Sequence, residues 1–190
     1  MIDPILLRIA KTAILAQFDC NIEIDRNKLL TEYPFLQSEA ATFVTLNYNH
    51  QLRGCIGSII AHRKLLDDII NNAELAAFND SRFKPVSKDE FPHLHIEVSI
   101  LTPPEEINYT DFNNLLDKIR PDIDGLILKY GHNQGTFLPQ VWETLQTTKD
   151  FLDHLSYKAG LNPSVYDKHP TVYRYEVKAI ENDFEAIVSL

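Results

Sequence analysis

Two adjacent segments in the first third of the chain have the pattern of β-strands, and this pattern limits the fold more than any other feature. The first segment covers 41–48 (ATFVTLNY), and the second covers 51–58 (QLRGCIGS), directly after the turn-forming residues 47–50. A strongly periodic helix pattern follows over 63–78. Adjacent hairpins beside helices exclude a regular parallel barrel. They predict an α+β or mixed α/β fold, with antiparallel-rich sheets flanked by helices.

The rest of the chain carries further helix and strand patterns. Apolar residues recur at helical spacing over 4–18, where Asp3 and Pro4 are typical of a helix start. Strands are predicted at 94–101, 125–130, 135–138 and 171–180, and further helices at 25–31, 110–118 and 149–159. No repeat, low-complexity tract or Gly/Ser linker divides the sequence. We therefore expect a single domain over 1–190, with room for two lobes.

Composition excludes several classes of protein. The formal net charge is −9, from 18 basic and 27 acidic residues, and no basic run is present, which argues against a nucleic-acid partner. No apolar stretch approaches the roughly 18–20 residues of a membrane-spanning helix, and the N-terminal segment lacks the pattern of a signal peptide. Two cysteines, Cys20 and Cys55, make no disulfide framework. We expect an acidic, soluble, cytoplasmic protein with two free thiols and no membrane contact.

The segment 52–58 carries the densest local signal. In a regular strand, alternate side chains share a face. Leu52 and Ile56 are therefore expected to point into the core. Gly54 lies between them, and its lack of a side chain would admit a close neighbour such as a helix.

The alternate residues of this segment form a candidate site. Arg53, Cys55 and Gly57 would share the other face, where a guanidinium can stabilise a thiolate and Gly57 would leave the surface open. Such a strand could present the Cys55 thiol to a small ligand. The alternative is that Cys55 is a small apolar filler, because free cysteines are often buried.

Asp80 and Arg82 directly follow the predicted helix over 63–78. A guanidinium binds carboxylate or phosphate through two parallel hydrogen bonds, so Arg82 is a candidate to hold an anionic ligand. The alternative is a local ion pair between Arg82 and Asp80 at the helix end.

The strand at 94–101 and the residue before it carry a polar face of His93, His95, Glu97 and Ser99. Positions 93 and 97 lie about 13 Å apart along a strand, whereas a zinc ligand atom lies about 2 Å from the metal. These side chains therefore cannot close one metal site, and we expect no metal. The candidates on this face are Glu97 and Ser99; the alternative is an ordinary solvated face.

A second candidate region begins at Pro139. This proline opens a short predicted helix and places Gln140 beside free N–H groups, which attract anions. Gln140 is therefore a candidate ligand-binding residue, and an ordinary helix start is the alternative. Trp142 is expected in the core.

Five segments resemble, in order, the motifs of one family. They are LRGCIG (52–57), DSRF (80–83, with Ser81 where the family has proline), EVSILTPPE (97–105), GLIL with GTFLPQVW (125–128 and 135–142), and FL with KAGL (151–152 and 158–161). On these motifs the chain resembles the AMMECR domain family, whose bacterial and archaeal members are called protein A of the AmmeMemoRadiSam system. The resemblance runs from about residue 5 to residue 180.

The resemblance implies a mixed α/β domain with a larger and a smaller lobe, and association with a Memo-like protein and a radical SAM protein. It implies no established reaction, and we expect no cofactor. Two functions stay open. The first is an accessory component that binds an unidentified small molecule through Arg53, Gly54, Gly57, Arg82, Ser99 and Gln140. The second is a small-molecule enzyme that uses Cys55 as nucleophile or redox thiol and Glu97 as proton carrier.

Overall fold

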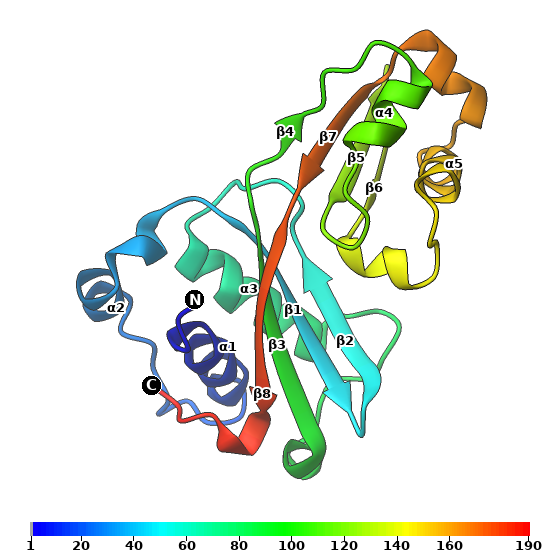
Figure 1. The fold of residues 1–190 in the computed structure, drawn as a ribbon. Coiled ribbons are helices and arrows are strands. Elements are labelled where there is room, and N and C mark those ends of the chain that lie inside the picture. The colour runs from blue at the N-terminus through cyan, green and yellow to red at the C-terminus, as the bar shows by residue number, and fades with distance from the viewer. Residues whose placement is uncertain (1) are drawn as a thin grey trace. The chain divides into compact units, whose positions relative to one another are not determined.

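The computed structural model describes residues 2–190, and the chain forms two compact units (Figure 1). The first unit contains the residues up to Leu101 together with Lys178–Leu190. The second unit is the continuous segment Thr102–Val177. Each unit has its own four-stranded sheet and its own hydrophobic core.

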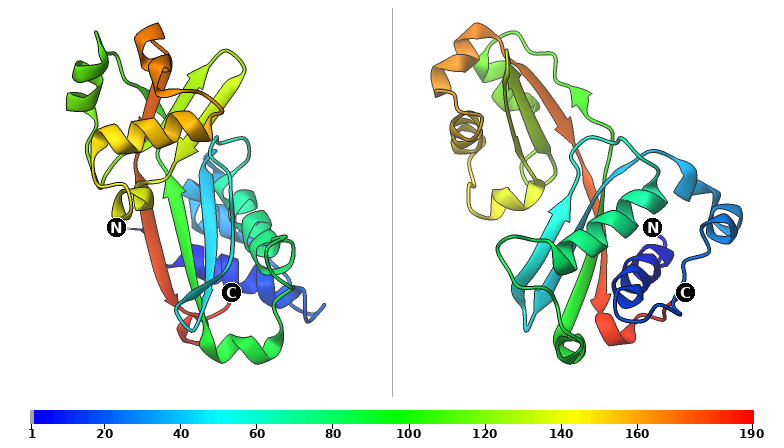
Figure 2. Two further views of the ribbon diagram at one scale, coloured as in Figure 1. Left: turned by 90° about the vertical axis from the view of Figure 1, so that its right-hand side faces the viewer. Right: turned by 180° about the vertical axis from the view of Figure 1, so that it is seen from behind.

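The first unit is a sheet with its principal helices on one side. The strand order is β2-β1-β3-β8, and β1 runs antiparallel to both β2 and β3. The strands are β1 (Ala41–Tyr48), β2 (Gln51–Gly57), β3 (Leu94–Leu101) and β8 (Val177–Asp183). The helices are α1 (Ile5–Ala16), α2 (Arg26–Glu32) and α3 (Leu65–Phe78), with short 3₁₀ helices η1 (Pro34–Gln37), η2 (Lys88–His93) and η5 (Phe184–Ala186). Figure 2 shows α1 and α3 on the same side of the sheet.

Alternation along the strands separates the two faces of this sheet. Val44 and Leu46 of β1, and Ile96 and Val98 of β3, are fully buried and belong to the core that α1 and α3 close. The residues between them point to the opposite face. We call this the polar face, and define it by Thr45, Cys55, Glu97 and Ser99.

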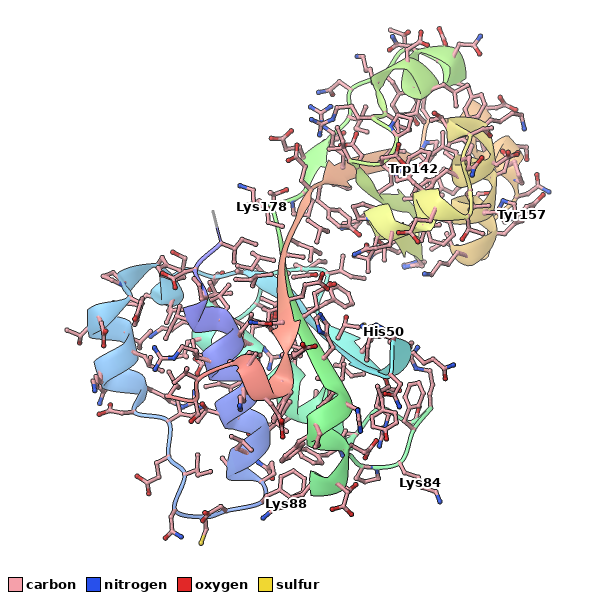
Figure 3. All side chains as sticks on the ribbon, turned by 60° about the horizontal axis from the view of Figure 1, so that its bottom comes forward. His50, Lys84, Lys88, Trp142, Tyr157 and Lys178 are labelled. Carbon is pink, nitrogen blue, oxygen red and sulfur yellow. The ribbon has the colours of Figure 1, made fainter. Side chains whose placement is uncertain are left out.

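Local sequence explains where α1 and α2 begin. The Asp3 carboxylate accepts a hydrogen bond from the Ile5 N–H at 2.9 Å, so Asp3 satisfies the start of α1 as predicted. Asp25 does the same for α2 through the Lys28 N–H at 2.9 Å. The β1–β2 turn places Asn49 and His50 at positive φ, and Figure 3 labels His50 at this hairpin.

The second unit has a sheet of order β4-β7-β5-β6. Its strands are β4 (Glu105–Glu106), β5 (Gly125–Tyr130), β6 (Asn133–Phe137) and β7 (Thr171–Tyr175), and its helices are α4 (Phe112–Lys118), α5 (Thr148–Lys158), η3 (Pro139–Glu143) and η4 (Pro163–Lys168). Trp142, which Figure 3 labels, is buried as predicted. Its ring stacks on Phe151 at a centroid distance of 3.9 Å, and its Nε1–H donates to the Asp124 carbonyl.

The fold class is confirmed, and the bounds of β1, β3 and β5 agree with the predicted strands. The prediction of one strand over 171–180 is wrong. The chain breaks at Glu176, whose N–H and C=O both bond to Thr102 at 2.9 Å. Residues before the break pair in the second sheet and those after it pair in the first, because the chain passes from one unit to the other at this point.

Candidate functional site on the polar face of the first sheet

Three side chains form a row across the polar face. Thr45 of β1 pairs with Cys55 of β2 on one side and with Glu97 of β3 on the other. Directly opposite residues of antiparallel strands point to the same face, so the thiol, the hydroxyl and the carboxylate lie next to one another. All three are partly exposed. The row was predicted only in part: Cys55 and Glu97 were candidates, but Thr45 was missed.

The Cys55 thiol is held by a hydroxyl group. Thr45 Oγ1 donates a hydrogen bond to Cys55 Sγ at 3.3 Å. This contact orients the sulfur on the face. A threonine hydroxyl does not take a thiol proton as a histidine or carboxylate would.

The backbone of Cys55 is fixed by an ion pair. β2 is the edge strand of its sheet, and edge strands carry unpaired backbone groups. At Cys55 the N–H donates to Asp80 Oδ2 at 3.0 Å, and the C=O accepts from Arg82 Nη2 at 3.2 Å. The two segments that resemble family motifs around Cys55 and Asp80 therefore meet at this edge.

The Asp80–Arg82 pair is strongly bonded. Arg82 Nε donates to Asp80 Oδ1 at 2.9 Å and Nη2 donates to Oδ2 at 2.6 Å. The hydrogen bonds from the Arg82 side chain, helped by the Cys55 N–H, hold the pKa of the Asp80 carboxyl well below its usual range, although burial opposes them. The Asp80 side chain is 4% exposed and that of Arg82 is 53% exposed. Arg82 thus forms the local ion pair considered above and still presents an open side beside Cys55.

Arg53 does not join the Cys55 face, which corrects the prediction. Leu46 pairs with Gly54 and Asn47 with Leu52, so a β-bulge leaves Arg53 without a partner in β1 and breaks the alternation. Its guanidinium binds Glu90 instead, at 2.6 Å from Nε and 3.2 Å from Nη2.

The Arg53 guanidinium donates hydrogen bonds to two acceptors, the Glu90 carboxylate and the Pro85 carbonyl. Burial raises the pKa of Glu90, but hydrogen bonds from Arg53 and Ser87 outweigh it and leave that pKa below the usual value. Arg53 Nη2 also donates to the Pro85 carbonyl at 3.3 Å. Among residues 2–190, Arg53 Nη1 is buried without a hydrogen-bond partner.

Two further predictions for this strand are wrong, and one is confirmed. Leu52 is 44% exposed, because the bulge pairs it with Asn47 rather than placing it over the core. Gly57 does not leave the surface open, since a Cβ there would lie 2.2 Å from the Phe43 ring. At Gly54, a Cβ would lie 2.1 Å from the Ala76 carbonyl of α3, which confirms the close helix. Gly54 and Gly57 therefore serve packing.

On β3, Glu97 and Ser99 bond to each other. Ser99 Oγ donates to Glu97 Oε1 at 2.8 Å, and Ser99 is 3% exposed. The two histidines have other partners: His95 contacts Glu181 and Asp183, and His93 packs edge-on against Tyr48. In the described part of the chain, no group of three or more His, Cys, Asp and Glu side chains has the arrangement of a metal site.

Gln140 is in the second unit and the other candidates are in the first. It is exposed on η3, a five-residue 3₁₀ helix that starts at Pro139.

A buried network around Asp68 was missed from the sequence. Asp68 is fully buried, and its carboxylate accepts hydrogen bonds from Thr42, Ser58 and Asn72 and contacts Arg63 at 3.1 Å. This network joins the start of α3 to the end of β2. The signal for it was the spacing of Asp68 and Asn72, which lie four residues apart beside the apolar rows of the helix.

These features define a class: a two-unit α+β protein with a polar row that contains a thiol on one face of its first sheet. The AMMECR1 family model matches residues 7–180. A protein of Methanosarcina mazei is 40% identical over 158 residues, covering 81% of this chain and 79% of that protein, and one of Methanocaldococcus jannaschii is 36% identical over 162 residues, covering 80% and 79%. The chain belongs to the AMMECR1 family.

A solved structure supports the same conclusion. The crystal structure of an uncharacterized protein from Pyrococcus horikoshii has a TM-score of 0.80 and 34% sequence identity, covering 94% of this chain and 90% of that one. Across residues 2–190, the structure contains no helix long and apolar enough to cross a membrane.

Proposed function

We propose that this protein is an accessory component that binds a small molecule on the polar face of its first sheet, and that it acts in the cytoplasm with a Memo-like and a radical SAM protein. The observation that carries the proposal is the row of Cys55, Thr45 and Glu97. Three polar groups of different chemistry occupy paired positions outside the core. They offer a thiol, a hydroxyl and a carboxylate to one ligand.

The anchoring and the exposure of the Arg82 side chain support ligand binding at the same place. Its guanidinium is anchored by Asp80 and by the Cys55 carbonyl, yet the side chain is 53% exposed. A group that is held on one side and open on the other is suited to position an acceptor of the ligand, because little side-chain entropy is lost on binding.

The contacts of the thiol favour a binding role over catalysis. A nucleophilic cysteine is activated by an adjacent base or by a strongly lowered pKa. Within the described residues, the hydrogen bond to the sulfur comes from Thr45, and no histidine or carboxylate bonds to it. The partner proteins are proposed from the family resemblance, and the net charge of −9 disfavours nucleic acid as an alternative partner.

The proposed ligand binding is tested by mass spectrometry of the small molecules that copurify with the native protein and are released when it is denatured. We expect at least one such molecule with the wild type. Its amount should fall severalfold in Cys55→Ala and stay unchanged in Cys20→Ala, because Cys20 is an exposed thiol outside the polar face. Equal amounts in both variants would place the ligand elsewhere and contradict the proposal.

The enzyme alternative is tested on the same protein. Catalysis by Cys55 predicts alkylation well below the pKa of about 8.5 of free cysteine. Iodoacetamide rates at Cys55 and Cys20 are measured across pH by peptide mass spectrometry, with Cys20 as the internal reference. Parallel pH profiles support the accessory role, and a Cys55 profile that begins at clearly lower pH supports the enzyme.

A further inference from the structure

A second candidate site lies in the first unit, between α1, α2 and the last described residues. The structure has a cavity of about 370 Å³ there, and Figures 1 and 2 show the three segments next to one another. This volume is within the usual range of small-molecule sites, about 300–1,000 Å³. None of the polar-face residues lines the cavity.

The cavity has an apolar part. Ile5 of α1 and Leu29 of α2 are 2% and 6% exposed and line it together with Tyr33. These side chains can cover a short aliphatic group and exclude water from it.

The basic side chains that line the cavity are those of Arg8 and Lys28. Arg8 Nε and Nη2 donate to the backbone carbonyls of Val188 and Ser189, both at 3.2 Å. These neutral acceptors fix the guanidinium without cancelling its charge. Among residues 2–190, no ion pair within 4.0 Å involves Arg8 or Lys28, which also lines the cavity.

The acidic side chains that line the cavity are those of Glu23, Asp25 and Glu32. Glu23 and Glu32 take part in no ion pair within 4.0 Å in the described part of the chain. Burial, and next the charge of Glu32, raise the pKa of the Tyr33 hydroxyl, so Glu32 lies beside this wall of the cavity. Asp25 differs, because its carboxylate caps α2.

We propose that this cavity binds a small zwitterionic amino compound of the size of an amino acid or a short peptide. Its carboxylate would contact Arg8, its ammonium would contact Glu32, and its aliphatic part would cover Ile5 and Leu29. Charges of both signs line one cavity without pairing with each other. A ligand that carries both charges forms charge-assisted hydrogen bonds at both ends, whereas a singly charged ligand satisfies one end only.

The test is a titration of the ¹⁵N-labelled protein, followed by amide NMR shifts, with three compounds of matched skeleton: L-leucine, 4-methylpentanoate and isopentylamine. We expect L-leucine to bind in the millimolar range or tighter and to shift the amides of α1 and α2. Each singly charged compound should bind about tenfold or more weakly. Absence of leucine-dependent shifts in α1 and α2, or equal binding of the three compounds, would overturn the proposal.

Three variants sharpen the titration. Arg8→Gln should weaken leucine binding about tenfold or more, but it also removes two bonds to the C-terminal segment. Glu32→Gln has the same expected effect and leaves the fold intact, because this side chain is exposed. Glu39→Gln, exposed and outside the cavity, is the matched control and should bind leucine as the wild type does. Unchanged binding by Glu32→Gln would contradict the assigned ammonium position.

Discussion

The two faces of the first sheet are built from the same strands but carry different kinds of side chain. On β1, Val44 and Leu46 are fully buried under the helices, whereas Thr45 between them is partly exposed beside Cys55 and Glu97. Burial of apolar area is the main source of stability in folding. Stability therefore comes mainly from the core face, and the polar face is the one on which we propose ligand binding.

The polar groups near the two faces also differ in burial and in the number of their hydrogen-bond partners. Asp68 is fully buried and its carboxylate is surrounded by donors from several elements, so it joins α3 to the sheet. Thr45 and Glu97 each have fewer contacts on the polar face. A fully bonded buried group holds the fold, whereas a partly exposed group with spare bonding capacity can also bind a ligand.

The largest expected effect is on the core face. Leu46→Ala removes a fully buried side chain and should lower the free energy of unfolding by about 2–5 kcal/mol. Thr45→Val, one position away, should change it by less than about 1 kcal/mol. Urea unfolding of both variants measures the difference, and equal losses would erase the distinction between the faces.

The next effect concerns the edge of β2. Asp80→Asn keeps an acceptor for the Cys55 N–H but loses the charge that binds Arg82. We expect a loss of about 1.5–3 kcal/mol at neutral pH.

The same substitution should change the pH dependence of stability. The pKa of Asp80 is lowered in the folded protein. Its contribution to the free energy of unfolding is therefore complete above the unfolded-state pKa of about 3.9, and it is lost as pH falls through the folded-state pKa. The wild type should therefore lose its advantage over Asp80→Asn in acid. A constant difference in unfolding free energy from neutral to acid pH would contradict this assignment.

A smaller effect is expected at Leu52. Regular alternation would place this side chain in the core, but the bulge leaves it 44% exposed. Leu52→Ala should therefore change the unfolding free energy by no more than about 0.5 kcal/mol, as exposed substitutions usually do. Ile56→Ala, whose side chain packs against the core, is the comparison and should cost more. A loss of several kcal/mol at Leu52 would show that the bulge is absent.

An effect of similarly small size is expected at His95. Burial lowers its pKa, but the hydrogen bonds that the carboxylates of Asp183 and Glu181 accept from the imidazole outweigh burial and raise the pKa above the usual value. The contribution of the charged histidine to the free energy of unfolding is therefore complete below about pH 6.5, the pKa of the unfolded state. It is lost as pH rises through the pKa of His95 in the folded protein. It should stay below about 1 kcal/mol, because both carboxylates are largely exposed.

The effect of His95 on the pH dependence of stability is measured by urea unfolding of the wild type and His95→Gln, at one pH below and one pH above the pKa values of this histidine. The difference between the two proteins should be larger at the lower pH. An identical difference at both pH values would show that the histidine does not link β3 to β8 through its charge.

Sequence patterns predicted the strands of this fold better than its contacts. The bounds of β1 and β3 followed from β-branched and alternating residues, because side-chain periodicity reports directly on a half-buried strand. The bulge at Arg53 was not predictable in this way. One extra residue in a strand leaves no mark in composition, yet it moved Leu52 out of the core and turned Arg53 toward Glu90.

The candidate site was predicted only where its members share a strand or a motif. Cys55 and Glu97 were found from their own strands, but Thr45 was missed because strand pairing is not visible in a single strand. The contacts of Asp80 and Arg82 with Cys55 join residues that lie 25 and 27 positions apart in the sequence. They depend on how the segment after α3 returns to the edge of β2, which local periodicity does not specify.

We infer that the polar face serves ligand recognition and contributes little to stability. Thr45→Val tests it most directly, because the substitution removes the hydroxyl at the centre of the row and preserves the shape of the side chain. Its unfolding free energy and the amount of copurifying small molecule are measured on the same preparation. We expect a change in unfolding free energy below about 1 kcal/mol with a severalfold loss of the bound molecule. A loss of several kcal/mol with the bound molecule unchanged would contradict it.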